Sequence, residues 1–176
     1  MDKLKLKELK EISRLSRIYS LMSIFFAGSG HPGGVLSCVD LIVYLYNERL
    51  KIKKIVQFKD LNRDRLILSK GHSVPAVYST LSALKVIDFK KSFQLRKINS
   101  LFQGHPCRIN TPWVEASTGS LGQGFSFAIG QALTLKYLKK KIKFFQLLET
   151  EKCKKGKFGK VSCLLLNINL KILLLF

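Results

Sequence analysis

Three loops of this sequence each place a histidine directly after a glycine. They are "SGHPGG" with His31, "SKGHSVP" with His72 and "QGHPCRINTP" with His105, and the chain has three histidines in all. Glycine lets a backbone approach a ligand closely, and the proline after two of these histidines stiffens its loop. Because imidazole exchanges protons near neutral pH, we predict that the three side chains do acid–base chemistry. The alternative, that each is an ordinary loop residue, stays open, and the absence of nearby carboxylates argues against zinc.

A fourth feature is the glycine-rich stretch "STGSLGQG", which includes Gly119, Ser120 and Leu121 and precedes an apolar helical pattern. Backbone N–H groups at such a helix start are suited to binding a phosphate. The stretch lacks the lysine of a P-loop and does not match the GxGxxG dinucleotide pattern. Taken alone it is therefore a weak indication of phosphate binding, since glycine turns also serve tight packing.

The elements that would position these loops are helices alternating with few strands. Apolar spacing predicts helices over residues 4–26, 36–50, 76–87, 93–99 and 125–138, and "DRLILS" (64–69) is a short apolar run typical of a buried parallel strand. This order indicates an α/β layer structure. Because ligands of open α/β sheets bind beyond the carboxyl ends of the strands, we expect the three histidine loops to converge there.

Composition limits the remaining classes of function. The net charge of +20 is typical of a polyanion binder, but residues 136–176 hold eleven of the lysines, and no aromatics interleave with arginines as in RNA-binding proteins. We therefore expect no nucleic-acid partner and keep a basic polyanion binder as the weakest alternative. The four cysteines form no CxxC pair, which favours a reducing cytosol, and no apolar run reaches the length of a membrane span.

Four segments together resemble a known family. "SGHPGGVLSCVDLIVYLY", "DRLILSKGHSVPAVYSTL", "LRKINSLFQGHPCRINTP" and "VEASTGSLGQGFSFAIGQAL" are similar to the cofactor-binding N-terminal region of transketolases, most of all those split into two subunits. The resemblance covers about residues 4–137. It implies an α/β thiamine-diphosphate-binding fold, a parallel sheet with helices on both faces, incomplete here at its C-terminal end.

The resemblance also implies a function. Transketolases use thiamine diphosphate and Mg²⁺ to move a two-carbon ketol unit between sugar phosphates, and His31, His72 and His105 would touch cofactor or substrate. Backbone and packing around Gly119, Ser120 and Leu121 would contact the cofactor. The implied partners are further copies of the chain, through self-association, and a separate C-terminal subunit, in the cytosol and without a membrane. Trp113, in "TPWVE", stands where the family has a small glycine, beside His105.

After the last resembling helix the sequence departs from the family. The family continues with a strand and "GDGEMQEGQIWE", whose aspartate binds Mg²⁺, but this chain has "LLETEKCKKGKFGK" there. Codons read one base out of frame from Leu148 and Glu149 permit all twelve residues of the missing motif. The run of lysines at 139–141 is a natural place to lose a base, so we interpret residues 1–140 as the family region and 141–176 as an out-of-frame tail.

This interpretation predicts a chain without metal ligands that is inactive on its own. It also predicts that the sheet loses the strand leading to the metal motif and everything after it. A non-enzymatic remnant or interaction module that keeps part of the fold is the alternative, and a genuine lysine-rich extension is the alternative for the tail.

Overall fold

The structure is a computed structural model, and it describes residues 2–50, 52, 54–60, 62–120, 123–140, 142–147 and 172–175. The helices are α1 (Lys3–Ala27), α2 (Pro32–Leu36), α3 (Val39–Tyr44), the π-helical turn η1 (Leu45–Leu50), the 3₁₀ helices η2 (Ile55–Lys59) and η3 (Gly71–Ser73), α4 (Val74–Ala83), α5 (Phe89–Ser92) and α6 (Gln123–Tyr137). The strands are β1 (Arg65–Leu68), β2 (Phe144–Leu147) and β3 (Ile172–Leu175).

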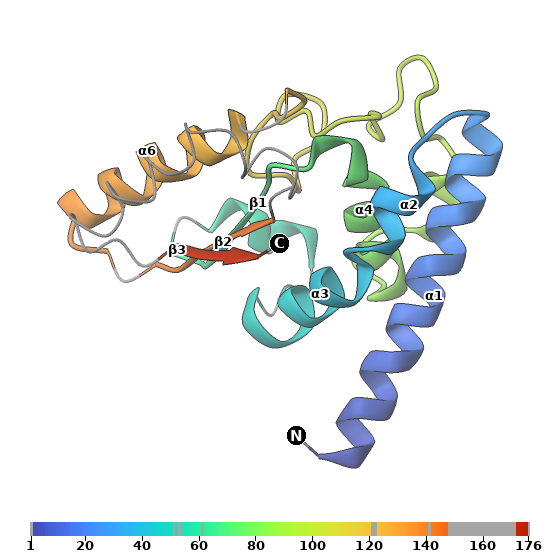
Figure 1. The fold of residues 1–176 in the computed structure, drawn as a ribbon, viewed down its shortest axis with the longest axis horizontal. Coiled ribbons are helices and arrows are strands. Elements are labelled where there is room, and N and C mark those ends of the chain that lie inside the picture. Colours follow the sequence, from blue (N-terminus) through green and yellow to red (C-terminus); the bar gives the residue numbers. More distant parts are fainter. Residues whose placement is uncertain are drawn as a thin grey trace.

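The three strands form one parallel sheet in the order β1-β2-β3, with helices on both faces (Figure 1). Leu66 and Leu68 of β1 belong to the main core with α3 and α4, whereas Ile67 points to a second cluster under α6. This alternation follows from the two-residue period of a strand, and both faces are covered as a parallel sheet requires. The predicted α/β layer architecture is confirmed.

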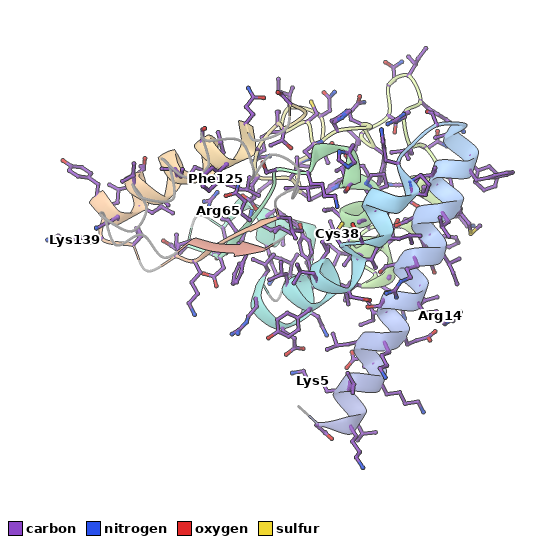
Figure 2. The ribbon with its side chains drawn as sticks, viewed as in Figure 1. Lys5, Arg14, Cys38, Arg65, Phe125 and Lys139 are labelled. Atoms are coloured by element: carbon purple, nitrogen blue, oxygen red, sulfur yellow. The ribbon has the colours of Figure 1, made fainter. Side chains whose placement is uncertain are left out.

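The long helix α1 packs along α4 on the side of the molecule opposite α6 (Figure 1). It begins at Asp2, whose Oδ1 accepts the N–H of Leu4, and ends at Gly28, which takes the left-handed conformation (φ 64°) that glycine adopts most easily. Its outer face carries both charged and large apolar side chains, among them Phe25, which is 79% exposed, and Figure 2 shows Arg14 pointing away from the rest of the molecule. Its buried face consists mainly of small side chains, which allow two helices to approach closely. These residues are Leu9, Ser13, Ser16, Ser20 and Ser23.

One local prediction is wrong. The helix expected over 93–99 is replaced by turns after the short α5, because Arg96 and Asn99 both adopt positive φ (61° each). The "HPGG" segment also begins a short helix of its own, since Pro32 occupies the first turn of α2, where its missing N–H costs nothing.

The expected loss of the strand after α6 is also wrong. Residues Phe144–Leu147 form β2, which pairs in parallel with β1 along its length, Arg65 opposite Phe144 and Leu68 opposite Leu147. Phe145 and Leu147 are buried in the main core, so the apolar "FFQL" run forms a strand where it pairs with β1. None of the helices among the described residues is long and apolar enough to cross a membrane.

Candidate active site

The loops that carry His31 and His72 meet directly. The centroids of their two rings lie 5.0 Å apart at an interplanar angle of 52°. His31 follows the end of α1 and is exposed, whereas His72 lies in η3, just after β1, and is half-buried. Two imidazoles from chain positions 41 residues apart are thus brought to one place.

Gly34 makes this approach possible. A Cβ atom added there would lie 2.8 Å from Nε2 of His72 and 3.1 Å from Oγ of Ser73, closer than real Cβ contacts allow. Any larger residue at position 34 would displace the His72 ring. The second glycine of "HPGG" therefore contributes close packing, in addition to the loop freedom that the sequence indicated.

The "STGSLGQG" stretch lies against the loop that follows β1. A Cβ atom on Gly71 would lie 2.9 Å from the carbonyl oxygen of Thr118 and 3.2 Å from Cα of Gly119. Likewise, a Cβ atom on Gly124 would lie 2.9 Å from Cα of Ser69. Because these neighbours are backbone atoms, the two segments touch main chain to main chain.

His105 lies beside the same stretch. A Cβ atom on Gly119 would be 3.8 Å from Cδ2 of the His105 ring, and the carbonyl of Pro106 accepts the N–H of Thr118 at 3.1 Å. Partial burial lowers the pKa of His105, and the charges of Arg96 and His31 lower it further. The His105 loop, the Gly119 stretch and the Gly71–His72 loop therefore lie against one another beyond the carboxyl end of β1, where His72 also meets His31.

The cofactor-binding residues expected from the sequence are placed only in part. Gly119 and Ser120 are exposed and lie just before α6, at the side of the histidine loops. Leu121 lies outside the described residues. Ser69, at the end of β1, has a buried hydroxyl group without a hydrogen-bond partner in the described part of the chain. This hydroxyl, together with the backbone around Gly119, is suited to hydrogen bonding a phosphate-bearing cofactor.

Two basic residues of the site were missed by sequence reasoning. Arg96 donates from Nη1 to Oγ of Ser29 (2.9 Å) and passes so close to Gly104 that a Cβ there would lie 2.5 Å from Nε of the arginine. Lys70 donates from Nζ to Oγ of Ser37 at 2.8 Å. The position of Lys70 directly before "GH" could have identified it, whereas no sequence signal joins Arg96 to the first loop.

Comparison with known proteins identifies the family. Residues 9–146 match the family described as "Transketolase, thiamine diphosphate binding domain". The chain belongs to the transketolase family. It is 34% identical to the transketolase of Mus musculus over 139 residues, which are 79% of this chain and 22% of that protein. It is also 36% identical to one subunit of the apulose-4-phosphate transketolase of Phocaeicola vulgatus over 125 residues, 71% of this chain and 44% of that protein.

Solved transketolase structures share the fold. The transketolase from Leishmania mexicana superposes with a TM-score of 0.80 at 23% identity, over 94% of this chain and 26% of that one. The transketolase of Pichia stipitis in complex with sedoheptulose-7-phosphate gives a TM-score of 0.70 at 26% identity, over 89% and 24%. The chain thus spans less than half the length of the relatives that it matches.

Trp113, which we expected from the sequence to depart from the family pattern, lies in the core. Its side chain is 4% exposed, and its ring packs 5.4 Å from Phe102 and 6.4 Å from Tyr78, centroid to centroid. The hydroxyl of Tyr78 donates to the carbonyl of Gln103, and Thr111 donates to that of Leu101 (2.6 Å). The indole therefore adds to the packing behind the His105 loop.

No metal-binding group accompanies the histidines in the described ranges. Among these residues no three histidine, cysteine, aspartate or glutamate side chains gather closely enough to hold a metal ion. The described side chains at the end of β1 are imidazoles, hydroxyls and cations, without the carboxylates that usually anchor Mg²⁺ in proteins. The groups described at this site are suited to a phosphate-bearing organic cofactor, and no cluster of metal ligands is found among them.

Proposed function

We propose that this chain is the N-terminal, thiamine-diphosphate-binding part of a transketolase and that its site lies where the three histidine loops meet. The observation that carries the proposal is the gathering of His31, His72 and His105 around Gly34 and Gly119 at the end of β1. Thiamine diphosphate, when bound, supplies the carbanion chemistry of ketol transfer. The residues of the chain supply orientation, charge and proton transfer.

Each group has a role in this proposal. With a lowered pKa, His105 is neutral at pH 7 and able to accept a proton from a sugar hydroxyl. The exposed His31 and the half-buried His72 are suited to hydrogen bonding diphosphate oxygens or donor-sugar hydroxyls. Arg96 and Lys70 provide the positive charge that a phosphate-bearing ligand needs. Backbone groups at Gly119, Ser120 and Leu121 contact the cofactor.

The proposal extends to the tail, which we read as out-of-frame sequence from about residue 141. Gln146 supports this reading: it is fully buried in β2, and neither atom of its amide has a partner in the described part of the chain. Its Cα partner is Ile67, which places it on the face of the sheet that packs under α6. A buried amide without partners is unfavourable, and natural strands rarely keep one.

Without the metal motif we expect weak or no binding of thiamine diphosphate with Mg²⁺. The cation is the largest charge in such a site, and removing one partner of a buried charge pair costs about 2–5 kcal/mol. At about 1.4 kcal/mol per tenfold, affinity falls by roughly 30-fold to several thousand-fold. The chain is then inactive on its own.

Calorimetric titration with thiamine diphosphate and Mg²⁺ tests this expectation. Two versions are compared: the chain as written, and one in which a single base is restored near the codons for residues 139–141. We expect the restored version to bind and the written version to bind at least about 30-fold more weakly. Equal affinities would show that the tail is not an out-of-frame metal site.

The proposal also includes a partner. One matched relative is named as a subunit of a transketolase, and we propose that a restored version of this chain likewise needs a separate C-terminal subunit, with the cofactor between them and sugar phosphates as substrates. Self-association and a cytosolic location belong to the same proposal. Ketol transfer by the restored chain alone would contradict the need for a second subunit.

A further inference from the structure

Glu115 has a buried carboxylate that lies outside the group of histidines. Its side chain is 6% exposed, and it forms ion pairs with Arg63 at 2.5 Å and with Arg65 at 3.2 Å. The two arginine side chains are themselves only 9% and 16% exposed. The cost of desolvating three charged side chains offsets much of their attraction, so this group of ion pairs adds little net stability. The ion pairs nevertheless require the three side chains to lie in one defined arrangement.

Both arginines are fixed at the start of β1. The guanidinium group of Arg63 donates to the carbonyl oxygens of Phe58 and Asp64, each at 3.1 Å, and its carbon lies 5.0 Å from the Phe58 ring centroid. Arg65 is the first residue of β1, and its N–H donates to the carbonyl of Lys143, next to β2. The carboxylate of Glu115 is therefore bound to two arginines that are each held by further contacts at the start of β1.

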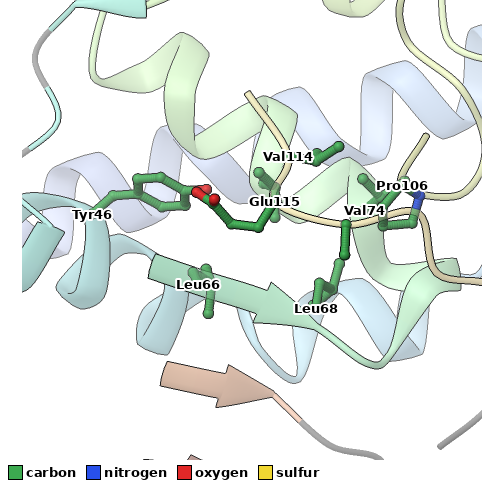
Figure 3. A pocket seen from close by; sticks show the side chains of 9 residues that line it. Tyr46, Leu66, Leu68, Val74, Pro106, Val114 and Glu115 are labelled. Atoms are coloured by element: carbon green, nitrogen blue, oxygen red, sulfur yellow. The ribbon is translucent and has the colours of Figure 1, made fainter. Parts of the chain in front are cut away.

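The segment that follows Glu115 runs along β1 in constant register. Glu115 pairs with Arg65 at the first residue of the strand, and Oγ1 of Thr118 donates to the carbonyl of Leu68, the last residue, at 2.6 Å. In both contacts the partners are 50 residues apart in the chain. Figure 3 shows the Glu115 side chain extending over β1 toward Tyr46, beside a cavity of about 10 Å³ that it helps to line.

This register controls two parts of the candidate active site. Thr118 is followed by Gly119, which touches the Gly71 loop and lies beside the His105 ring. The same segment is bonded to the His105 loop, because Ser117 accepts the N–H of Arg108 at 2.9 Å and Thr118 donates its N–H to Pro106. A displacement of the segment along β1 would therefore move Gly119 and His105 together.

We propose that Glu115 is a positioning residue of the candidate active site. Its carboxylate, held by Arg63 and Arg65, sets the register of residues 115–118 on β1 and thereby places His105 and Gly119 beside the His31 and His72 loops. The importance of this placement for chemistry rests on the proposed function, but the placement itself is measurable without cofactor. A failure of the positioning proposal can therefore be distinguished from a failure of the proposed function.

The test compares the full chain with its Glu115→Gln variant by NMR. Since the chain has three histidines, their ring signals are assigned by single substitutions and titrated with pH. Loss of a nearby negative charge alone would lower the pKa of His105. Loss of register moves His105 away from Arg96 and out of its partly buried place, so we expect its pKa to rise toward the ordinary value.

Hydrogen exchange provides the second readout. We expect amides of residues 106–120 to exchange at least about tenfold faster in Glu115→Gln, while α4 keeps its protection. The matched control is Glu11→Gln, which removes the same charge from an exposed pair with Arg14 (2.6 Å) on α1 and should change neither readout.

The absence of either change in Glu115→Gln overturns the proposal. Equal acceleration of exchange in α4 also overturns it, because the carboxylate would then stabilise the fold as a whole. If Glu115→Gln does not fold, Glu115→Asp replaces it. Aspartate keeps the negative charge but is one methylene shorter, so its carboxylate cannot reach both Arg63 and Arg65 while the segment stays in this register. That variant should show smaller changes in the same directions, and wild-type behaviour in both readouts would refute the positioning role.

Discussion

Replacing Gly71 by alanine tests the contact between the His72 loop and the glycine-rich stretch. The new Cβ would lie 2.9 Å from the carbonyl oxygen of Thr118, 3.1 Å from its carbonyl carbon and 3.2 Å from Cα of Gly119. All three neighbours are backbone atoms, so no side-chain rotation relieves the overlap. Thr118 is also held by its bond to Leu68, which limits how far the stretch can retreat.

Overpacking of this kind costs about 1–3 kcal/mol of unfolding free energy. We expect Gly71→Ala to lower stability by that amount in urea unfolding, followed by circular dichroism and by the fluorescence of Trp113, the single and buried tryptophan. The His105 ring signal should shift as well, because Gly119 lies against that ring.

Gly130 provides the matched control. It lies within α6, and a Cβ added there meets nothing within 4 Å, so Gly130→Ala should stabilise the chain by about 0.5–1 kcal/mol through better helix propensity. The two substitutions add the same methyl group and are expected to act in opposite directions. A Gly71→Ala variant as stable as the parent chain would refute the close approach of the two segments.

Two further outcomes follow from the buried and titratable groups. Gln146→Met should raise the unfolding free energy by about 1–3 kcal/mol, because it removes a buried amide without partners in the described part of the chain. Gln103→Met should lower the unfolding free energy, because Nε2 of Gln103 donates to the carbonyl of Ser100 at 2.6 Å. Urea unfolding of both variants measures the contrast, and destabilisation by Gln146→Met would contradict this prediction. Because the folded pKa of His105 lies below its unfolded value of about 6.5, the unfolded chain takes up the proton more readily and stability falls as pH decreases below about 6.5. His105→Asn should flatten that part of the stability–pH profile, and an unchanged slope would show that His105 is not its source.

Local patterns in the sequence were sufficient for the main elements. Helical spacing predicted α1 and α6 closely, and the apolar run at 64–69 predicted β1. Such patterns succeed because burial of one face dictates residue periodicity within a single element. They failed at residues 93–99, where positive φ at Arg96 and Asn99 depends on surroundings far along the chain.

For the candidate site, the sequence by itself indicated which loops are candidates to carry chemistry. The Gly-His loops and the "STGSLGQG" stretch are local signatures, because glycine and proline act on the backbone at their own positions. The interpretation of residues 141–176 as an out-of-frame tail also came from the sequence, by comparison with the family pattern, and stays a prediction. The assignment of His31, His72 and His105 to cofactor or substrate stays a prediction.

Only the tertiary structure decided how these loops are held together. The bond from Arg96 to Ser29 joins residues 67 apart, and the pairing of Glu115 with Arg65 joins residues 50 apart. No periodicity encodes such pairs, because they depend on where the turns between elements direct the chain. The same holds for β2, since the "FFQL" run becomes a strand by pairing with β1, whose edge is presented to it only in the folded chain.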